Sequence, residues 1–241
     1  TFDGRAFHDV GSYEKITMRL TMAVDPEDPR NSEIIDLAMA RRDADGRVRY
    51  TTTVVIFKPI DLGRGNGRIF YDVLNRGRKI GLGLMNDAPR VNDPSVADHA
   101  GNGFLMRQGY TVVWSGWQTD APPGDARMFL EAPMVPGIEG LSREEFIFDH
   151  GRNPAVATLN YPAARLEPDA ARLTVRQYAH DVRQTPPDLS FRYFPVTRGG
   201  TFFTSARQIL VDRPVGFDAG AIYEIVYTAS DAVVAGLAFA S

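Results

Sequence analysis

The sequence contains no cysteine. Disulfide bonds, thiolate metal sites and a cysteine nucleophile are therefore excluded. Long apolar runs are missing too, and we expect no membrane span because a spanning helix needs roughly 18 apolar residues. No signal peptide is visible, and Thr1 stands where an initiator methionine would. We expect an upstream segment to have been removed, and both a cytoplasmic and an exported (periplasmic or secreted) location stay open.

A one-sided charge is also missing. The 27 lysines and arginines nearly balance the 30 aspartates and glutamates, which leaves a net charge of -3. The basic residues are mostly arginines and are scattered, whereas a nucleic-acid-binding protein usually gathers them in a patch. We therefore expect no nucleic-acid partner. With 44% hydrophobic residues, the composition indicates a globular protein of one large or two modest domains.

Metal ligands at a useful spacing are absent as well. The four histidines are His8, His99, His150 and His180. They lack the i, i+4 spacing and the nearby carboxylates that a zinc site requires. We interpret each as a surface or hydrogen-bonded loop residue and predict no metal site.

The glycine-rich loops do not match a nucleotide-binding pattern. The loop from Gly63 to Gly67 precedes a strand, whereas a dinucleotide fingerprint follows one. The stretch from Gly77 to Gly83 follows a strand but lacks the G-x-G-x-x-G order. We interpret both as turns and predict no cofactor.

The first part of the chain reads as a β-meander. Alternating polar and apolar residues predict a strand over Tyr13–Val24. Further strands are predicted over Ile34–Arg41 and Val48–Lys58, and the turn at Asp43–Gly46 would join them as a hairpin.

The pattern then changes to strand, helix and strand. Arg68–Val73 is a short apolar run typical of a strand buried on both faces. Ser95–Gln108 has helical character near its end, and Thr111–Trp114 is the next strand. Such a unit almost always crosses over to a parallel strand, so we predict a parallel sheet that begins near Arg68.

The remainder is rich in short strands with turn residues between them, which indicates a sandwich-like insertion. The strands are predicted at 128–131, 145–149, 173–178, 189–194, 201–211 and 221–228. Ala232–Ala240 looks like the start of a buried helix with Asp231 as its N-cap. We expect the chain to stop inside that helix.

Four blocks of the sequence resemble bacterial proteins known as α/β-hydrolase domain-containing proteins. They are Asp3–Ile16 (DGRAFHDVGSYEKI), Asp72–Lys79 (DVLNRGRK), Gly101–Gln118 (GNGFLMRQGYTVVWSGWQ) and Gly220–Ala240 (GAIYEIVYTASDAVVAGLAFA). The resemblance spans nearly the whole chain and is weakest in the β-rich insertion. It implies an α/β fold with a large β component, in which a β-meander and the start of a parallel sheet form the N-terminal half of an α/β-hydrolase core.

Three segments follow from that fold. Residues 1–119 would form the first half of the hydrolase core, and residues 120–219 would form the β-rich sandwich-like insertion. Residues 220–241 would return to the core as a strand and the truncated start of a core helix.

The sequence contains no G-x-S-x-G nucleophile elbow, and the nearest match, Trp114–Trp117, lacks the preceding glycine. The resemblance implies an elbow of the form G-x-S-x-S-G-R, with the catalytic acid and histidine after it, all beyond residue 241. We therefore predict the N-terminal part of a serine hydrolase that cleaves carboxylic esters. Its partners would be the C-terminal remainder of its own protein and a small ester substrate.

The resemblance also implies an oxyanion hole at Asn75, Arg76 and Gly77. In such hydrolases the loop after this strand donates a backbone N–H to the developing charge on the substrate oxygen. The glycine would let the backbone approach the substrate closely, and the Asn75 side chain could add a donor. An ordinary turn is the alternative, with Arg76 paired to Asp72 to hold the loop.

The end of the next strand would supply the other wall of the substrate pocket. Trp117 could pack against an acyl or aromatic group, and Gln118 or Asp120 could orient polar substrate atoms. Packing between the sheet and the insertion is an equally good interpretation of Trp117.

Two other functions stay open. The β-rich region could be a non-catalytic binding module for carbohydrate or a protein partner. Alternatively, the chain could be one product of proteolytic processing that works as a heterodimer with the part that carries the serine.

Overall fold

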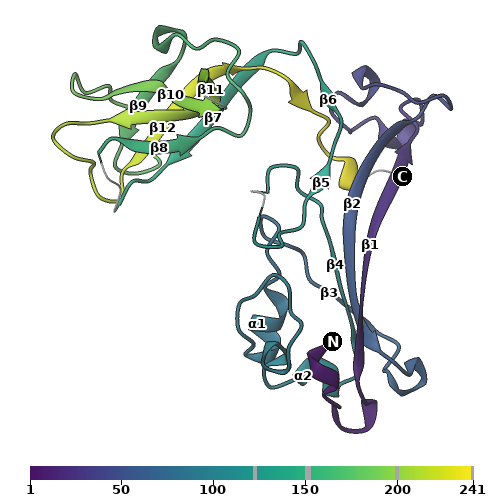
Figure 1. The fold of residues 1–241 in the computed structure, drawn as a ribbon. Helices are drawn as coiled ribbons and strands as arrows, with labels where there is room; N and C mark the ends of the chain where they lie inside the picture. Colours follow the sequence, from purple (N-terminus) through teal and green to yellow (C-terminus); the bar gives the residue numbers. More distant parts are fainter. Residues whose placement is uncertain (122–123, 150–152, 199–200, 240–241) are drawn as a thin grey trace. The chain divides into compact units, whose positions relative to one another are not determined.

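The computed structural model describes residues 1–121, 124–149, 153–198 and 201–239. Strands make up 38% of it and helices 15%. The chain divides into two compact units, the first of Thr1–Pro133 with Val233–Ser241 and the second of Met134–Ala232. Figure 1 traces the chain through both.

A five-stranded sheet forms the first unit. Its order is β1 (Tyr13–Val24), β2 (Val48–Pro59), β4 (Thr111–Ser115) and β3 (Ile69–Tyr71), and β5 (Leu130–Glu131) also pairs with β2. Strands β3 and β4 run parallel, and the other pairs are antiparallel. Among the described residues β3 is therefore an edge strand, with β4 as its neighbour.

Strands β1 and β2 are matched along their whole length. Their register runs from Tyr13 opposite Pro59 to Val24 opposite Val48. Strand β1 covers one edge of β2, and β4 and β5 cover the other, so residues 25–47 only connect β1 to β2. The predicted strand over Ile34–Arg41 is therefore wrong, and a short 3-10 helix, Leu37–Met39, lies there instead.

The helices of this unit are short. The α-helices are α1 (Gly81–Asn86) and α2 (Phe104–Arg107). Short 3-10 helices occupy Phe2–Gly4, His8–Val10, Pro29–Asn31, Leu37–Met39, Leu62–Arg64, Ala97–Ala100 and Leu237–Phe239. The helical character predicted before Gln108 is confirmed by α2, but Gly101 and Gly103, both at positive φ, limit its length.

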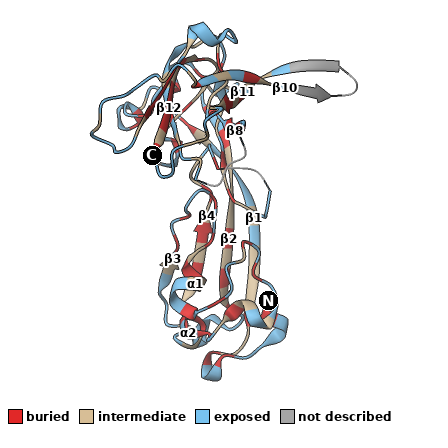
Figure 2. Cartoon of the chain, turned by 90° about the vertical axis from the view of Figure 1, so that its left-hand side faces the viewer, coloured by how far each residue is buried: buried red, intermediate tan, exposed pale blue. Residues whose placement is uncertain are grey.

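One face of the sheet carries the core of the first unit. Phe57 of β2 and Trp114 of β4 are fully buried there, with their ring centroids 4.9 Å apart. Leu82 of α1 and Met106 of α2 belong to the same cluster. Figure 2 shows β4 with its buried residues in red, whereas β1 is mostly half-buried or exposed.

The opposite face of the sheet is also apolar. Ile16, Ile56, Val113 and Tyr71 are successive partners in one row across β1, β2, β4 and β3. Successive side chains of a strand point to opposite faces, so this row lies on the face away from Phe57 and Trp114. Its β3 end is the most open, since Tyr71 is 47% exposed.

The second unit contains two three-stranded antiparallel sheets. They are β10 (Ser190–Arg198), β11 (Thr201–Asp212) and β8 (Ala155–Thr158), and β7 (Gly140–Phe146), β12 (Ile222–Ala229) and β9 (Arg172–Arg176). Ile209 of β11 and Tyr223 of β12 are fully buried in one cluster that both sheets share. A 3-10 helix, Pro168–Ala170, precedes β9. The segments that enter and leave this unit, β6 (Met134–Val135) and β13 (Ala232–Val233), pair with each other.

The predicted fold class is wrong. An α/β fold that is half of an α/β-hydrolase core needs a parallel sheet covered by helices, but the sheets here are mostly antiparallel and the described chain has only two α-helices, each shorter than two turns. The β-meander is also shorter than predicted. The division into 1–119, 120–219 and 220–241 stays a prediction.

The helix predicted over Ala232–Ala240 is wrong as well, as far as the described residues reach, since Ala240 lies outside them. Ala232 and Val233 form a strand, and Gly236 at φ 94° separates it from the 3-10 helix Leu237–Phe239. Asp231 has a positive φ of 52°, which is unlike the extended backbone of an N-cap. Gly81 and Gly83, predicted to lie in a turn, belong to α1.

Candidate functional site

The loop after β3 makes a tight turn over Asn75–Arg78. The Arg78 N–H donates to the Asn75 carbonyl over 3.0 Å, and both central residues have positive φ, 48° at Arg76 and 77° at Gly77. Two successive positive φ angles are typical of a type I′ turn. A non-glycine residue such as Arg76 is strained in this conformation, so the surrounding structure must hold it.

Gly77 is fixed by close packing. Its carbonyl accepts a hydrogen bond from the Met128 N–H over 3.0 Å. A Cβ atom at this position would lie 2.6 Å from the Met128 carbonyl oxygen, closer than a side chain can come. Glycine is therefore required here for space as well as for conformation.

The turn is tied to the segment that follows β4. The Arg76 N–H donates to Gln118 Oε1 over 2.7 Å, and the Arg76 guanidinium contacts the Asp120 carboxylate over 2.8 Å and its carbonyl over 3.1 Å. Trp117 Nε1 donates to the Leu74 carbonyl over 2.8 Å and packs on the core. The two loops meet because parallel strands end at the same edge of a sheet.

Asp72 anchors the base of this loop. Its Oδ2 atom accepts hydrogen bonds from the backbone N–H groups of Ile80 and Gly81, over 3.1 and 2.7 Å, and from Trp114 Nε1 over 2.6 Å. It holds the start of α1 against β4, since an anion is stabilised at a helix N-terminus. The pairing of Arg76 with Asp72 that the sequence suggested is wrong, because Arg76 pairs with Asp120.

Lys79 follows the turn and points into the protein. Only 7% of the residue is exposed, and its Nζ donates to the Asn92 carbonyl over 2.6 Å. The ammonium lies 5.9 Å from the centre of the Trp114 ring, which attracts a cation weakly. Burial lowers the pKa of Lys79 to about 8 because the charged form loses its hydration.

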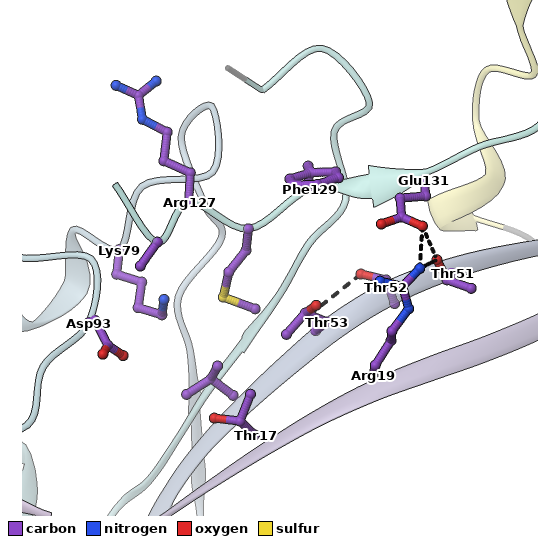
Figure 3. A pocket seen from close by; sticks show the side chains of 13 residues that line it. Thr17, Arg19, Thr51, Thr52, Thr53, Lys79, Asp93, Arg127, Phe129 and Glu131 are labelled. Atoms are coloured by element: carbon purple, nitrogen blue, oxygen red, sulfur yellow. Dashed lines mark hydrogen bonds and ion pairs between the residues drawn. The ribbon is translucent and has the colours of Figure 1, made fainter. Parts of the chain in front are cut away.

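A cavity of about 180 Å³ lies beside Lys79. Strands β1 and β2 form one wall, and the segment from Ala126 to Glu131 forms the other (Figure 3). The charged and hydroxyl-bearing side chains that line it are Thr17, Arg19, Thr51, Thr52, Thr53, Lys79, Asp93, Arg127 and Glu131. Arg19 is engaged by Glu131, so its charge is already balanced.

The structure therefore brings most of the predicted site residues together. Arg76 contacts both Gln118 and Asp120, and Trp117 lies against the same loop. Asn75 begins the turn with an exposed side chain that hydrogen-bonds to no described residue. The Arg76 N–H, a predicted oxyanion donor, is occupied by Gln118, whereas the Gly77 N–H donates to no residue that the structure describes.

The histidines do not converge. His8 is exposed, the His99 ring accepts a hydrogen bond from the Ser95 N–H, and His180 stacks on Tyr178 at the surface. His150 lies outside the described residues. In the part of the chain that the structure covers, no group of three potential ligands could hold a metal ion, and no helix is long and apolar enough to cross a membrane.

The sequence did not indicate Lys79 as a residue of this site, and it indicated Asp72 only as a partner of Arg76. One signal was present for Lys79, because it is one of only three lysines in a chain that otherwise uses arginine. Lysine can lose its charge on burial and arginine cannot, so a lysine in an apolar setting is informative. The pairing of Gln118 with a backbone N–H has no sequence signature.

No known protein family, curated protein or solved structure matches the chain.

Proposed function

We propose that the chain is the substrate-facing part of a serine hydrolase that cleaves small carboxylic esters, and that another polypeptide segment supplies the nucleophile, the acid and the histidine. One observation carries the proposal. The turn Asn75–Arg78, which follows the edge strand β3, has a backbone N–H at Gly77 that donates to no described residue. The resemblance of the Asp72–Lys79 block to bacterial hydrolases supports the same assignment.

The edge position of β3 favours pairing with a strand from another polypeptide segment. An edge strand presents unpaired N–H and C=O groups, which are a template for another strand. A strand added parallel to β3 would end beside Asn75–Arg78, since parallel strands end at one edge. A serine placed there would have its substrate carbonyl next to the Gly77 N–H.

The apolar face of the sheet supports an added layer. Ile69 and Tyr71 of β3 and Val73, which follows it, lie on the same face of the sheet, and each is at least 47% exposed. The row from Ile16 to Tyr71 extends this face across the sheet. Apolar surface of this kind marks an interaction site.

The reaction would be acyl transfer to water. The serine hydroxyl, deprotonated by histidine, attacks the ester carbonyl, and the alcohol leaves with the proton returned by that histidine. Water then attacks the acyl-serine by the same route and releases the acid. In both steps the Gly77 N–H would donate to the oxyanion, and the hydrogen bond from Arg76 to Gln118 would hold the turn in place.

A fluorophosphonate probe and p-nitrophenyl acetate test the proposal. Residues 1–241 alone should neither be labelled nor hydrolyse the ester, whereas the polypeptide or complex that also carries the nucleophile should do both. In that active form, Gln118→Ala should lower kcat by about tenfold to a hundredfold, because the turn loses its support. The control Glu33→Ala alters an exposed residue far along the sequence and should keep full activity.

Two results contradict the proposal. Labelling of a serine within residues 1–241 would show that this chain itself carries the nucleophile. An active form in which no serine is labelled would rule out a serine hydrolase.

A second candidate function is carbohydrate binding by the second unit. A hollow of about 370 Å³ is lined by polar side chains that include Gln177, Asp181 and Gln184, and the exposed Tyr178 ring, stacked on His180, lies in the same loop. Amides, carboxylates and an aromatic face suit sugar hydroxyls and the apolar face of a sugar ring. A glycan array should then give a signal that Tyr178→Ala removes. Equal signals from both proteins exclude this role.

A further inference from the structure

Lys79 is a buried cation without an ion pair in the described structure. The only hydrogen bond of its ammonium there goes to the Asn92 carbonyl, although an ammonium has three N–H donors. Asp93, which attracts it electrostatically, pairs with Lys15 instead. Asp72 also attracts the ammonium electrostatically, but its Oδ2 atom is bound by two backbone N–H groups and by Trp114. A buried charge without a partner is costly, so a counter-charge would be stabilising.

The space for such a counter-charge lies next to Nζ. The cavity beside Lys79 has a volume of about 180 Å³, more than ten times the roughly 10–15 Å³ of cavity volume that holds one water molecule. Figure 3 shows the Lys79 side chain reaching towards this space from one side and Thr17 and Thr53 facing it from the strands. A small organic molecule fits a cavity of this size.

Two hydroxyl groups in the wall, one of them on the exposed residue Thr17, are available to a ligand. The Thr51 hydroxyl donates to the Glu131 carboxylate and the Thr52 hydroxyl to the Gly116 carbonyl. The hydroxyls of Thr17 and Thr53 have no hydrogen-bond partner among the described residues and line the cavity. Each can donate one hydrogen bond to an oxygen atom of a ligand.

Part of the remaining wall is apolar. Val55 of β2 and Met128 are buried, with 5% and 4% exposed, and both line the cavity. They suit a short hydrocarbon chain, whereas the ammonium and the hydroxyls suit an anionic head group. One buried ammonium balances one negative charge, which favours a carboxylate over a phosphate dianion.

We propose that this cavity is a binding site for a short-chain organic carboxylate. The ammonium of Lys79 pairs with the carboxylate, the hydroxyls of Thr17 and Thr53 donate to its oxygens, and Val55 and Met128 contact its alkyl chain. The site uses residues that the proposed ester hydrolysis does not, so it stands whether or not that function is correct.

Calorimetric titration of the whole chain with acetate, propionate, butyrate and inorganic phosphate tests the site. We expect saturable binding of the carboxylates that strengthens with chain length, because each added CH₂ group is buried against Val55 and Met128. Lys79→Met should weaken that binding at least tenfold. The matched control is Lys58→Met, which removes another lysine of the same unit, one paired with Glu14, and should leave the affinity unchanged.

The affinity for the carboxylate should also decrease as the pH rises. Only the protonated ammonium pairs with the anion, and the pKa of Lys79 is about 8. Binding should therefore weaken by about tenfold between about pH 7 and pH 9 in the wild type and in Lys58→Met. The other charged groups that line this space are Asp93, Arg19, Arg127 and Glu131, and the charges of Asp72 and Lys15 also act on the Lys79 ammonium.

Thr53→Val keeps the test decisive if Lys79→Met does not fold. It removes one hydroxyl at nearly constant shape and should weaken binding by about tenfold or more, since a hydrogen bond to a charged group is stronger than one between neutral groups. The proposal is wrong if the wild type binds none of the carboxylates saturably. It is equally wrong if phosphate binds more tightly than butyrate, or if neither Lys79→Met nor Thr53→Val weakens binding.

Discussion

At the scale of single residues, the turn Asn75–Arg78 depends on Gly77. We expect Gly77→Ala to lower the free energy of unfolding by about 2–4 kcal/mol, because positive φ and a clash with the Met128 carbonyl act together. The control is Gly67→Ala, at φ 69° with no atom within 4 Å of the added Cβ, where only the cost of positive φ applies. Urea unfolding of both variants measures the difference. Equal losses would mean that Gly77 has room.

Lys79 predicts a pH dependence of stability. The pKa of Lys79 is about 8 in the folded chain, whereas the ordinary pKa of a lysine, which applies in the unfolded chain, is 10.5. Between these values the unfolded chain binds more protons, so stability should rise with pH relative to a variant without this lysine. Lys79→Met removes the effect, and the difference in unfolding free energy between the two proteins should change by up to about 3 kcal/mol across this window. A constant difference contradicts the burial of Lys79.

The candidate site was predictable in part at this scale. The order of strand, helix and strand predicts that the loops after β3 and β4 lie side by side, and Arg76 does contact Gln118 and Asp120. The orientation of the turn was not predictable. It depends on Gln118 accepting from the Arg76 N–H and on Met128 packing over Gly77, contacts between residues far apart in sequence.

At the scale of elements, the open edge and face of β3 predict association. The chain should bind a dye for exposed apolar surface, and it should self-associate at high concentration. Replacing Tyr71 and Val73 with lysine should suppress both effects. The two side chains are exposed, so the unfolding free energy should change by less than about 0.5 kcal/mol.

Sedimentation velocity and dye fluorescence of the wild type and the double variant measure these effects. The matched control replaces Val215, which is 76% exposed in the second unit, with lysine. A wild type that stays monomeric and binds no dye would show that the face is already covered.

The positions of the strands in the sequence were more predictable than the way in which the strands pair. Alternation along Tyr13–Val24 predicts β1 correctly, and the apolar residues of Thr111–Trp114 predict β4. Ile34–Arg41 has strand-like residues too, but β2 pairs with β1 over its full length, and this segment forms only a single bridge, from Ile35 to Ala235. Strand pairing is decided by long-range contacts, which a local pattern does not contain.

At the scale of the whole molecule, the two hydrophobic clusters predict two folding units. Phe57 and Trp114 belong to one cluster, and Ile209 and Tyr223 belong to the other. We expect the isolated segment Met134–Ala232 to fold, with a cooperative urea transition and near-UV circular dichroism from its buried tyrosines.

A buried carboxylate provides the variant for this test. Glu224 is 1% exposed and accepts two hydrogen bonds from Arg183, over 2.6 and 2.9 Å, and these lower its pKa. Glu224→Ala should destabilise the second unit by about 3 kcal/mol, since it leaves a guanidinium without its partner. Urea unfolding of the whole chain should show two transitions, and Glu224→Ala should shift only the transition of the second unit to lower urea concentration. A single transition that shifts as a whole would mean that the units unfold together.

The pairing of β6 with β13 has a consequence for how such a protein can change. The residues at which the chain enters and leaves the second unit, Met134–Val135 and Ala232–Val233, lie next to each other. A segment whose ends are adjacent can be deleted, lengthened or exchanged for another domain without separating the residues on either side. Replacing the domain between β6 and β13 would therefore join the first unit, with its sheet and its Asn75–Arg78 turn, to a different second domain. Both evolution and protein engineering could take this route.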